Sequence, residues 1–287
     1  MAQPAVAEII RDARARLAAV GVDGPDAELL AAWAAGRSLG ELRIDMALGR
    51  ALDADALTRF GAAVARRLAR EPLQHITGRA PFRHIELAVG PGVFTPRPET
   101  ELLVDVALDH LRQLQSGTTT VLDVGTGTGA VAISIARESE ARVVAVEASP
   151  AAFVWARRNI LELSPQTVLL HGDARDTAAL AAVGIVPGSL AALVSNPPYV
   201  PHAAVPADHE VRHDPETALY SGADGLDLIR DLIALGAQLV EPGGLVAFEH
   251  TEEQGAMVRQ LLASGGFRDA RTHRDLAGRD RVTAAIR

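Results

Sequence analysis

From about Thr119 to the C-terminus, short apolar runs alternate with stretches of helical spacing, and this is the clearest pattern in the chain. The apolar runs are TVLDV (120–124), RVVAVE (142–147), TVLLH (167–171), LAALVS (190–195) and GLVAFEH (244–250). Helical spacing lies near residues 129–138, 150–163, 225–240 and 252–264, and further strands are expected at 267–273 and 281–286. Strands that alternate with helices are typical of a parallel sheet covered by helices, so the pattern predicts an α/β domain.

The first 80 residues show a different pattern, with many alanines and leucines at helical spacing. The clearest example follows Asp53, a good residue to cap a helix N-terminus, and consists of Leu57, Phe60, Val64 and Leu68. Glycine and proline interrupt the pattern at residues 21–25, 36–40 and 49–53. The segment 1–80 is therefore predicted to be a small bundle of short helices that forms its own domain.

A short alternating segment, FRHIELAVGPGVF (82–94), joins these two regions and contains Gly90, Pro91 and Gly92. Alternation around such a turn sequence predicts a β-hairpin, which we place in a linker over residues 81–97. The segment TPRPETE then begins a helix expected from about Pro98 to Leu114. The α/β domain accordingly spans residues 98–287.

Composition narrows the possible functions. With 287 residues and 48% hydrophobic content, the chain can bury a large core, and it contains no cysteine for disulfides, thiolate catalysis or metal binding. No apolar run approaches the roughly 20 residues of a membrane span, and charges interrupt the apolar positions near the N-terminus, so we expect a cytoplasmic protein. The formal net charge of −8 argues against a protein that holds nucleic acid mainly through phosphates.

A glycine-rich loop follows the first predicted strand of the α/β domain, with Gly125, Gly127 and Gly129 in DVGTGTGA. Glycines let backbone N–H groups approach a ligand closely at a helix start, so the loop predicts a nucleotide-like cofactor. The spacing fits both dinucleotide-binding and methyltransferase domains, and Glu147 is placed to bind ribose hydroxyls in either. Asp123 favours the methyltransferase alternative, in which an acidic residue there commonly helps to hold the methionine amino group.

The tetrapeptide Asn196-Pro197-Pro198-Tyr199 follows the fourth strand, at the edge where open α/β sheets bind ligands. It suits methylation of an amide nitrogen, because the hydrogens of that nitrogen need acceptors as it gains positive charge. The Asn196 side-chain oxygen and the Pro197 carbonyl can be those acceptors, and the prolines hold them rigidly. The Tyr199 ring can pack on the planar target group. These four residues are the predicted catalytic group, and a dehydrogenase has no need for them.

Together these motifs resemble those of the PrmC/HemK family of protein-(glutamine-N5) methyltransferases. The matching segments are FTPRPETE (94–101), DVGTGTGAVAISIA (123–136), VVAVEASPAA (143–152), NPPYVP (196–201), DPETALYSGADGL (214–226) and PGGLVAFEHTEEQG (242–255). They cover most of the chain from about residue 70 onward. The spacing of FTPRPETE from NPPY is specific to the family, whereas the glycine loop alone is not.

The resemblance implies a seven-stranded, Rossmann-like class I methyltransferase sheet and a helical N-terminal domain that grips a peptide chain release factor. S-adenosyl-L-methionine would be the cofactor, and the glutamine of the release factor's Gly-Gly-Gln motif would be methylated, which modulates translation termination. The residues expected to bind the cofactor are Asp123, Gly125, Thr126, Gly127, Thr128, Gly129, Glu147, Asp173, Ala174 and Asn196. Those expected to bind the glutamine or to line the mouth of the site are Thr95, Pro96, Arg97, Glu99, Asn196, Pro197, Pro198 and Tyr199. We expect a monomer that needs no metal and contacts neither a membrane nor nucleic acid.

Two other functions remain open at this point. A nucleic-acid amino-methyltransferase faces the same chemistry at an adenine or cytosine amine and uses related tetrapeptides. A methyltransferase-like binding module would keep the fold without turnover. Arg97 and Glu99 could equally form a surface ion pair near a helix start.

The connection over residues 201–224 is too long for a simple turn, and we expect either a lid or a peptide-contacting segment. It contains three histidines without the context of a metal site, namely His202, His209 and His213. We therefore expect these histidines to be ordinary residues of an exposed loop.

Overall fold

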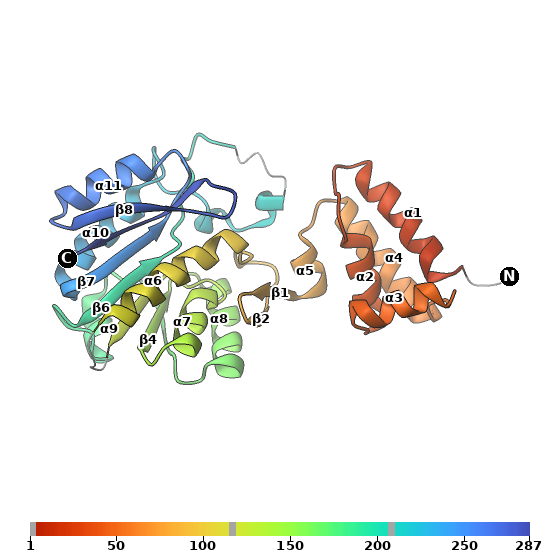
Figure 1. Cartoon of the computed structure of the whole chain (residues 1–287), viewed down its shortest axis with the longest axis horizontal. Coiled ribbons are helices and arrows are strands. Elements are labelled where there is room, and N and C mark those ends of the chain that lie inside the picture. The colour runs from red at the N-terminus through yellow and green to blue at the C-terminus, as the bar shows by residue number, and fades with distance from the viewer. Residues whose placement is uncertain (1–3, 115–118, 206–209) are drawn as a thin grey trace. The chain divides into compact units, whose positions relative to one another are not determined.

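The computed structural model describes residues 4–114, 119–205 and 210–287. Within them the chain forms two compact units. Unit 1 contains the described residues up to Arg79 together with 210–213, and unit 2 contains the remainder. Figure 1 labels many of the helices and strands of both units, with the colour running from red at the N-terminus to blue at the C-terminus.

Unit 1 is a bundle of short helices, as its alanine and leucine pattern predicts. They are α1 (Val6–Ala18), α2 (Asp26–Ala35), α3 (Leu39–Ala47), α4 (Ala54–Leu68) and α5 (Leu73–Thr77). Asp53 caps α4 as expected, because its carboxylate accepts the backbone N–H of Ala56 at 2.7 Å. The apolar helix faces close on a core that contains Leu17, Leu30 and Phe60. Each such side chain contributes roughly 1.5–3 kcal/mol when it leaves water, so burial holds the bundle together.

A later segment of the chain also belongs to unit 1. The 3-10 helix η2 (Glu210–His213) packs there, and the Glu210 carboxylate pairs with the guanidinium of Arg67. Arg67 is buried in α4 and also donates from Nε to Asp26 at 2.6 Å. An unpaired cation would be strongly disfavoured in such a buried position. The Arg67–Glu210 ion pair therefore helps to hold η2 on the helical bundle.

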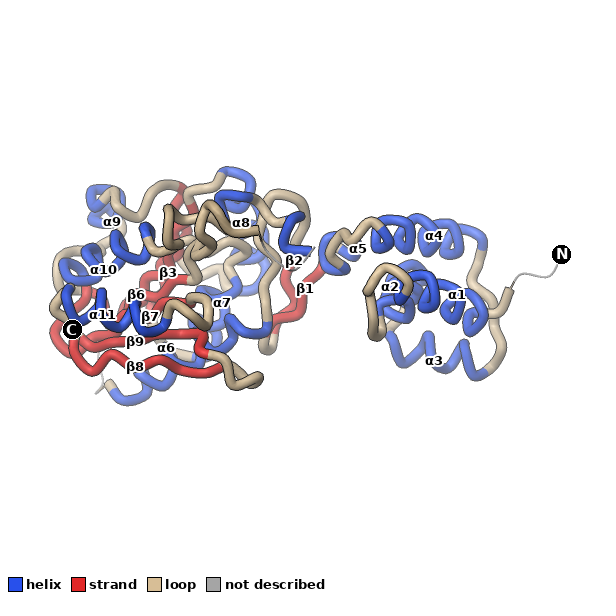
Figure 2. The backbone as a smooth tube through the Cα atoms, turned by 90° about the horizontal axis from the view of Figure 1, so that it is seen from above, coloured by secondary structure: helices blue, strands red, loops and turns tan. Residues whose placement is uncertain are grey.

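Unit 2 is built on a mixed sheet of seven strands, the fold class that the sequence predicts. They are β3 (Thr120–Val124), β4 (Arg142–Glu147), β5 (Val168–His171), β6 (Leu190–Ser195), β7 (Val240–Glu249), β8 (Arg268–Arg274) and β9 (Asp280–Ile286). Their order is β5-β4-β3-β6-β7-β9-β8, and only β9 runs antiparallel to its neighbours. Figure 2 shows these strands in red between the helices of unit 2. The order reverses between β3 and β6, so the carboxyl ends of these strands meet where open α/β sheets bind ligands.

Helices cover both faces of the sheet. They are η1 (Pro98–Thr100), α6 (Glu101–Gln113), α7 (Ala130–Glu138), α8 (Pro150–Leu163), α9 (Thr177–Ala182), η3 (Glu216–Ala218), α10 (Asp227–Leu239) and α11 (Gly255–Ser264). Successive residues of β3 point to opposite faces of the sheet and so belong to two different hydrophobic cores. Val121 lies in the same core as Leu103 of α6, and Leu122 lies in the same core as Leu232 of α10. In the described residues, no helix combines the length and the apolar character needed to cross a membrane.

The connecting β-hairpin lies earlier in the chain than expected. Its strands are β1 (Arg79–Phe82) and β2 (Ile85–Ala88), and the turn between them begins at Arg83. Arg83 has a positive φ of 49°, and its guanidinium holds both carboxylate oxygens of Glu138 at 2.7 Å. Residues other than glycine rarely adopt a positive φ, so this turn carries no glycine signal in the sequence.

The segment Gly90-Pro91-Gly92 does not form the hairpin turn that its sequence suggests. A Cβ at Gly90 would lie 2.6 Å from the Trp155 ring of α8, so only glycine lets the chain pass so close. The Trp155 Nε1–H also donates to the carbonyl of Pro91 at 3.3 Å. Residues 91 and 92 do form a turn, with Gly92 at a φ of 88°, but no strands pair across it, so the prediction of a hairpin here was wrong. Close packing against an aromatic ring requires glycine just as a hairpin turn does.

Candidate active site

The glycine loop lies between β3 and α7, at the carboxyl edge of the sheet. Gly125, Gly127 and Gly129 have φ values of 69°, 59° and 86°, which glycine adopts without strain. A Cβ added to Gly125 or Gly127 would meet no atom within 4 Å, whereas one on Gly129 would lie 3.0 Å from Ile133. The first two glycines therefore leave open space beside the loop for a ligand, and the third packs the loop against α7.

Asp123, near the end of β3, holds the glycine loop through hydrogen bonds. The residue is buried, and its Oδ2 accepts the Thr126 hydroxyl at 2.6 Å and the backbone N–H of Ala132 at 3.1 Å. Burial raises the pKa of Asp123 to about 7, although these two hydrogen bonds act in the opposite direction, and the nearby Glu147 raises it further. The carboxyl group thus braces both the loop and the first turn of α7. A cationic ligand group near it would favour its ionised form.

Glu147 ends β4 and is brought next to the glycine loop by the pairing of β4 with β3. Its Oε2 accepts the backbone N–H of Gly127 at 2.8 Å, and its Oε1 accepts that of Ser149 at 2.8 Å. The side chain is almost fully buried. Each carboxylate oxygen has more than one lone pair, so Glu147 can still accept hydroxyl groups of a ligand.

The turn after β5 carries Asp173 and Ala174. The backbone N–H of Gly172 donates to the carbonyl of Glu147 at 2.9 Å, which holds this turn beside the end of β4. The Asp173 carboxylate is half exposed and engages Arg175, with 2.9 Å from Nε to Oδ1 and 2.6 Å from Nη2 to Oδ2. These bonds to Arg175 lower the pKa of Asp173. The Ala174 side chain is buried in the core beneath.

Asn196 follows β6, and its side chain meets the FTPRPETE segment. Its Nδ2 donates to Oγ1 of Thr100 at 3.1 Å, although the two residues are 96 positions apart. Thr100 is buried in η1, and Pro197 is buried next to Asn196. With its nitrogen bonded to Thr100, the Asn196 carboxamide has its oxygen to offer to a ligand.

Tyr199 is held at both its hydroxyl and its carbonyl. The hydroxyl donates to Oε1 of the buried Glu249 at 3.3 Å, and burial together with this carboxylate raises the pKa of Tyr199. The carbonyl accepts from Nε2 of Gln254 at 3.0 Å, and the same nitrogen donates to the carbonyl of Asp224 at 3.0 Å. Gln254 therefore ties the end of the tetrapeptide to the later segment that contains Asp224.

Gly225 passes so close to Tyr199 that a side chain cannot fit. Its φ is 80°, and a Cβ would lie 2.1 Å from the Tyr199 carbonyl oxygen and 2.7 Å from Gln254 Nε2. We expect Gly225→Ala to lower the free energy of unfolding by about 2–5 kcal/mol, from backbone strain plus overpacking. Gly188→Ala is the matched control, because Gly188 has a φ of 70° and open space around its Cβ position.

Thermal or urea unfolding of the two glycine variants measures this difference. Gly188→Ala should show the strain of the positive φ alone, about 1–2 kcal/mol. Equal destabilisation of both variants would contradict a steric role for Gly225.

The residues expected at the mouth of the site have different surroundings. Thr95 is buried, and its backbone N–H donates to Oδ1 of Asp214 at 3.3 Å. Arg97 pairs with the other oxygen of the buried Asp214 at 3.2 Å, and its guanidinium lies 5.7 Å from the centre of the Phe94 ring. Glu99 instead pairs with Arg279 at 3.3 Å, with both side chains partly exposed. Glu99 thus forms the surface ion pair considered as its alternative, whereas Arg97 anchors a buried carboxylate.

The two ends of the long connection after the tetrapeptide are hydrogen-bonded to each other. The Val200 N–H donates to the Leu219 carbonyl at 2.7 Å, and the Ser221 N–H donates to the Val200 carbonyl at 3.0 Å. His209 and the middle of the expected lid, residues 206–209, lie outside the described residues. Within residues 4–114, 119–205 and 210–287, no group of three or more histidine or acidic side chains is arranged to hold a metal ion.

Several residues that hold the site together were not singled out from the sequence, namely Thr100, Asp214, Gly225, Glu249 and Gln254. All lie in segments that resemble the family, but nothing local distinguishes their roles. The best sequence signal was a polar residue at the end of an apolar strand, as Glu249 is in GLVAFEH. Their partners are distant in sequence, so the roles become visible only in the fold.

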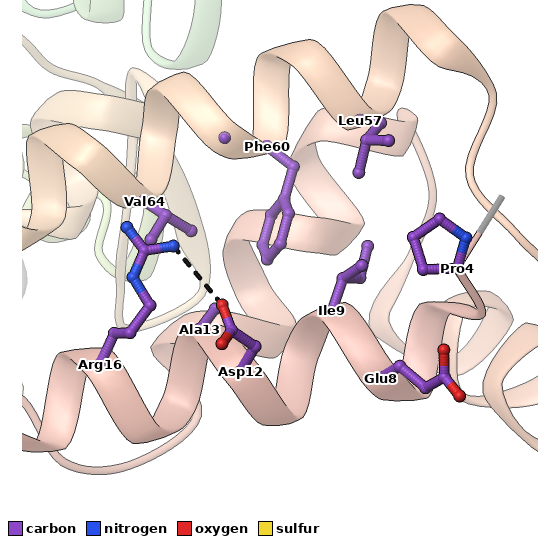
Figure 3. A pocket seen from close by; sticks show the side chains of 10 residues that line it. Pro4, Glu8, Ile9, Asp12, Ala13, Arg16, Leu57, Phe60 and Val64 are labelled. Carbon is purple, nitrogen blue, oxygen red and sulfur yellow. Dashed lines mark hydrogen bonds and ion pairs between the residues drawn. The ribbon is translucent and has the colours of Figure 1, made fainter. Parts of the chain in front are cut away.

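Unit 1 carries a separate open groove of about 350 Å³ between α1 and α4. Figure 3 shows Ile9 of α1 and Phe60 of α4 turned toward it from opposite sides. Glu8 and Asp12 lie along the α1 edge. Arg16 lies on the same edge and pairs with Asp12 at 3.5 Å, so the groove has a largely apolar floor and an edge of mixed charge.

Comparison with known proteins relates both parts of the chain to protein families. Residues 8–78 match the family model of the PrmC N-terminal domain, and residues 121–195 match a methyltransferase domain model. The chain is 45% identical to a Streptomyces coelicolor protein named release factor glutamine methyltransferase, over 96% of each chain. A protein of the same name from Corynebacterium glutamicum is 43% identical over 97% of each chain.

Comparison with solved structures relates the chain to a methyltransferase fold. The 16S rRNA N2 G1207 methyltransferase of T. thermophilus, solved with AdoMet and guanosine, matches with a TM-score of 0.51. The match covers 73% of this chain and 49% of that one, at 22% identity. At this identity the likeness concerns the fold alone, and it confirms the predicted class I methyltransferase sheet.

Proposed function

Because the chain belongs to the release factor glutamine methyltransferase family, we propose that it methylates the side-chain amide of the glutamine in the Gly-Gly-Gln motif of release factors. It is an S-adenosyl-L-methionine-dependent methyltransferase, and the modification it makes tunes translation termination. The observation that carries the proposal is the Asn196 carboxamide, which Thr100 holds at the ligand-binding edge of the sheet.

The residues around the glycine loop fit S-adenosyl-L-methionine. The space beside Gly125 and Gly127 can take the methionine part, and the buried carboxyl of Asp123 suits its cationic amino group. Glu147 can accept the ribose hydroxyls, and the turn at Asp173 and Ala174 is the proposed site of the adenine. When bound, the cofactor supplies a methyl group on a positively charged sulfur.

The tetrapeptide can activate an otherwise poor nucleophile. An amide nitrogen attacks weakly because its lone pair is delocalised into the carbonyl, and it becomes positively charged as the new bond forms. The Asn196 oxygen and the Pro197 carbonyl accept its two N–H groups, and these bonds strengthen as the charge grows. The methylated amide is then acidic enough to lose its proton to water, so no strong base is needed. Tyr199 forms part of the wall against which the glutamine side chain lies.

The decisive experiment incubates the protein with methyl-labelled cofactor and a purified release factor, then locates the methyl group by peptide mass spectrometry. We expect it on the glutamine of the Gly-Gly-Gln motif. A release factor with glutamate at that position is the matched control and should remain unlabelled. Label on DNA or RNA in parallel reactions, or on other release factor residues, would contradict the proposal.

The helical unit, placed at residues 1–80 and followed by the linker 81–97, is the proposed docking domain for the release factor. The groove between α1 and α4 offers a surface for a partly apolar segment of that partner, because Ile9, Leu57 and Val64 line it. We further propose that the protein acts as a monomer in the cytoplasm, without binding nucleic acid directly.

Filling the groove tests this docking role. Gly61 lines the groove in α4, and a Cβ there would meet no atom within 4 Å, so larger side chains fit without distorting the helix. We expect Gly61→Leu to raise KM for the release factor roughly tenfold, or about 1.4 kcal/mol, with kcat unchanged.

Gly61→Ala is the matched control for the groove. It brings the same gain in helix propensity, about 1 kcal/mol, but occupies little of the space. Steady-state kinetics with varied release factor compares the two variants. The same KM for both would argue against docking in the groove.

A further inference from the structure

Glu249 ends β7 beside the catalytic tetrapeptide, yet the chemistry described above gives it no role. The residue is 2% exposed, and its carboxylate accepts the Tyr199 hydroxyl at 3.3 Å, while the Thr100 hydroxyl lies close enough to lower the pKa of this carboxylate by hydrogen bonding. Its Oε2 is buried without a hydrogen-bond partner among the described residues. A buried and partly unsatisfied carboxylate destabilises a fold, so its presence here has another reason.

Thr100 links Glu249 to the Asn196 carboxamide. The Thr100 hydroxyl has one proton to donate, and an ionised carboxylate can only accept. Thr100 therefore turns its proton toward Glu249 and accepts from Asn196, in agreement with the 3.1 Å bond from Asn196 Nδ2 to Thr100 Oγ1. The nitrogen of the planar carboxamide is then on the Thr100 side, and its oxygen is turned away from Thr100.

We propose that Glu249 is a positioning residue that fixes, through Thr100, which end of the Asn196 carboxamide faces the substrate. The inference rests on the proposed function, in which Asn196 presents an acceptor to a nitrogen that is gaining positive charge. Without the charge of Glu249, Thr100 can donate to the Asn196 oxygen, and the carboxamide can turn its nitrogen toward the substrate. A donor in that place removes one acceptor and opposes the developing charge.

The surroundings of Glu249 set the pH at which this role is best tested. Burial raises the pKa of Glu249 to about 7, while the hydrogen bonds from Thr100 and Tyr199 and the charge of Arg281 act against this rise. The nearby Glu99 raises the pKa further. The carboxylate is the major form above pH 7, so the variants are compared at about pH 8.

Thr100→Val tests the link because it keeps the side-chain shape and removes the hydroxyl. We expect kcat to fall roughly 10- to 100-fold, with KM for the release factor and Kd for the cofactor within about twofold of wild type. Thr100→Ser restores the hydroxyl and should recover most of the lost kcat. Thr167→Val is the matched control: Thr167 is also buried and hydrogen-bonded, to Ser164 at 2.9 Å, but it precedes β5, away from the ligand-binding edge.

Glu249→Gln tests the other end of the link. Its amide can donate to Thr100, so we expect a loss of kcat similar to that of Thr100→Val. Because both residues act through one hydrogen-bond chain, the double variant should be no slower than the slower single variant. A kcat within roughly threefold of wild type for both single variants, or a Thr100→Ser variant without recovery, would overturn the proposal.

A measurement without substrate separates this inference from the proposed function. In 15N-labelled protein, the side-chain NH2 protons of Asn196 should show an NMR contact with the Thr100 side chain, and Glu249→Gln should weaken or abolish it. Persistence of the contact in Glu249→Gln overturns the inference, whatever the activity. A wild-type protein that shows the contact but does not methylate a release factor contradicts the proposed function alone.

Discussion

The Asn196→Ala variant should lose roughly 10²- to 10³-fold in kcat for release factor methylation. Its affinity for S-adenosyl-L-methionine should stay close to that of wild type. Alanine removes the oxygen that accepts an N–H of the target amide, and that bond strengthens only as the nitrogen gains charge. Release factor binding depends on contacts elsewhere, so we expect little change in KM.

Single-turnover kinetics and calorimetric titration of the cofactor measure the two quantities separately. Asn196→Asp is the informative companion, because it keeps an acceptor for the glutamine but can no longer donate to Thr100 when it is ionised. We expect an intermediate rate for it. An Asn196→Ala variant with near-normal turnover would refute the role given to the carboxamide, and a loss of cofactor binding would show a role in the cofactor site instead.

The sequence predicted the elements whose signals are local. Apolar runs marked the strands of the sheet, and the helical spacing after Asp53 marked α4, because burial of one face requires such patterns. The short helix α9 (Thr177–Ala182) and the start of β7 at Val240 were missed. One is too short for a clear period, and the other passes through Pro242, Gly243 and Gly244, residues that normally interrupt strands.

For the candidate site, the sequence predicted the positions of the motifs but not the contacts that orient them. The glycine loop and the tetrapeptide each follow one strand, so their position at the same sheet edge follows from the topology. The hydrogen bonds that orient them do not, because Thr100 and Asn196 are 96 residues apart, and Tyr199 and Glu249 are 50 apart. Buried polar groups find partners wherever the fold supplies them, and a single sequence does not name those partners.

Asp123→Asn should make the cofactor-free protein more stable at pH 8 and leave it nearly unchanged at pH 4. The pKa of Asp123 is about 7 in the folded protein, against 3.8 for an unperturbed aspartate. Between these pH values the folded state keeps a proton that the unfolded state has lost, so stability falls as pH rises through this window. The rise of this pKa from 3.8 to about 7 corresponds to roughly 4 kcal/mol at most of lost stability above pH 7.

Thermal unfolding of wild type and Asp123→Asn from pH 4 to pH 8 tests this difference. Asparagine keeps an oxygen that can accept from Thr126 and Ala132, so the loop should remain braced. The pKa of Glu249 is raised in the same direction as that of Asp123. Glu249→Gln should therefore also reduce the pH dependence of stability, independently of Asp123→Asn. Parallel curves of stability against pH for wild type and Asp123→Asn would contradict the raised pKa of the buried Asp123.

Although Asp123→Asn should make the cofactor-free protein more stable, it should weaken binding of the cofactor. If Asp123 pairs with the cationic amino group of S-adenosyl-L-methionine, binding favours the ionised carboxylate, and Kd in wild type should decrease as pH rises from 6 to about 7.5, a range in which an α-amino group is still mostly protonated. Asp123→Asn should bind the cofactor roughly tenfold more weakly at pH 8, with little of this pH dependence left. An unchanged affinity in the variant would mean that Asp123 serves the loop alone. A buried carboxylate at this position lowers the stability of the cofactor-free protein. A purely structural role would leave that loss without any gain in ligand binding, and this is the reason we expect Asp123 to contact the cofactor.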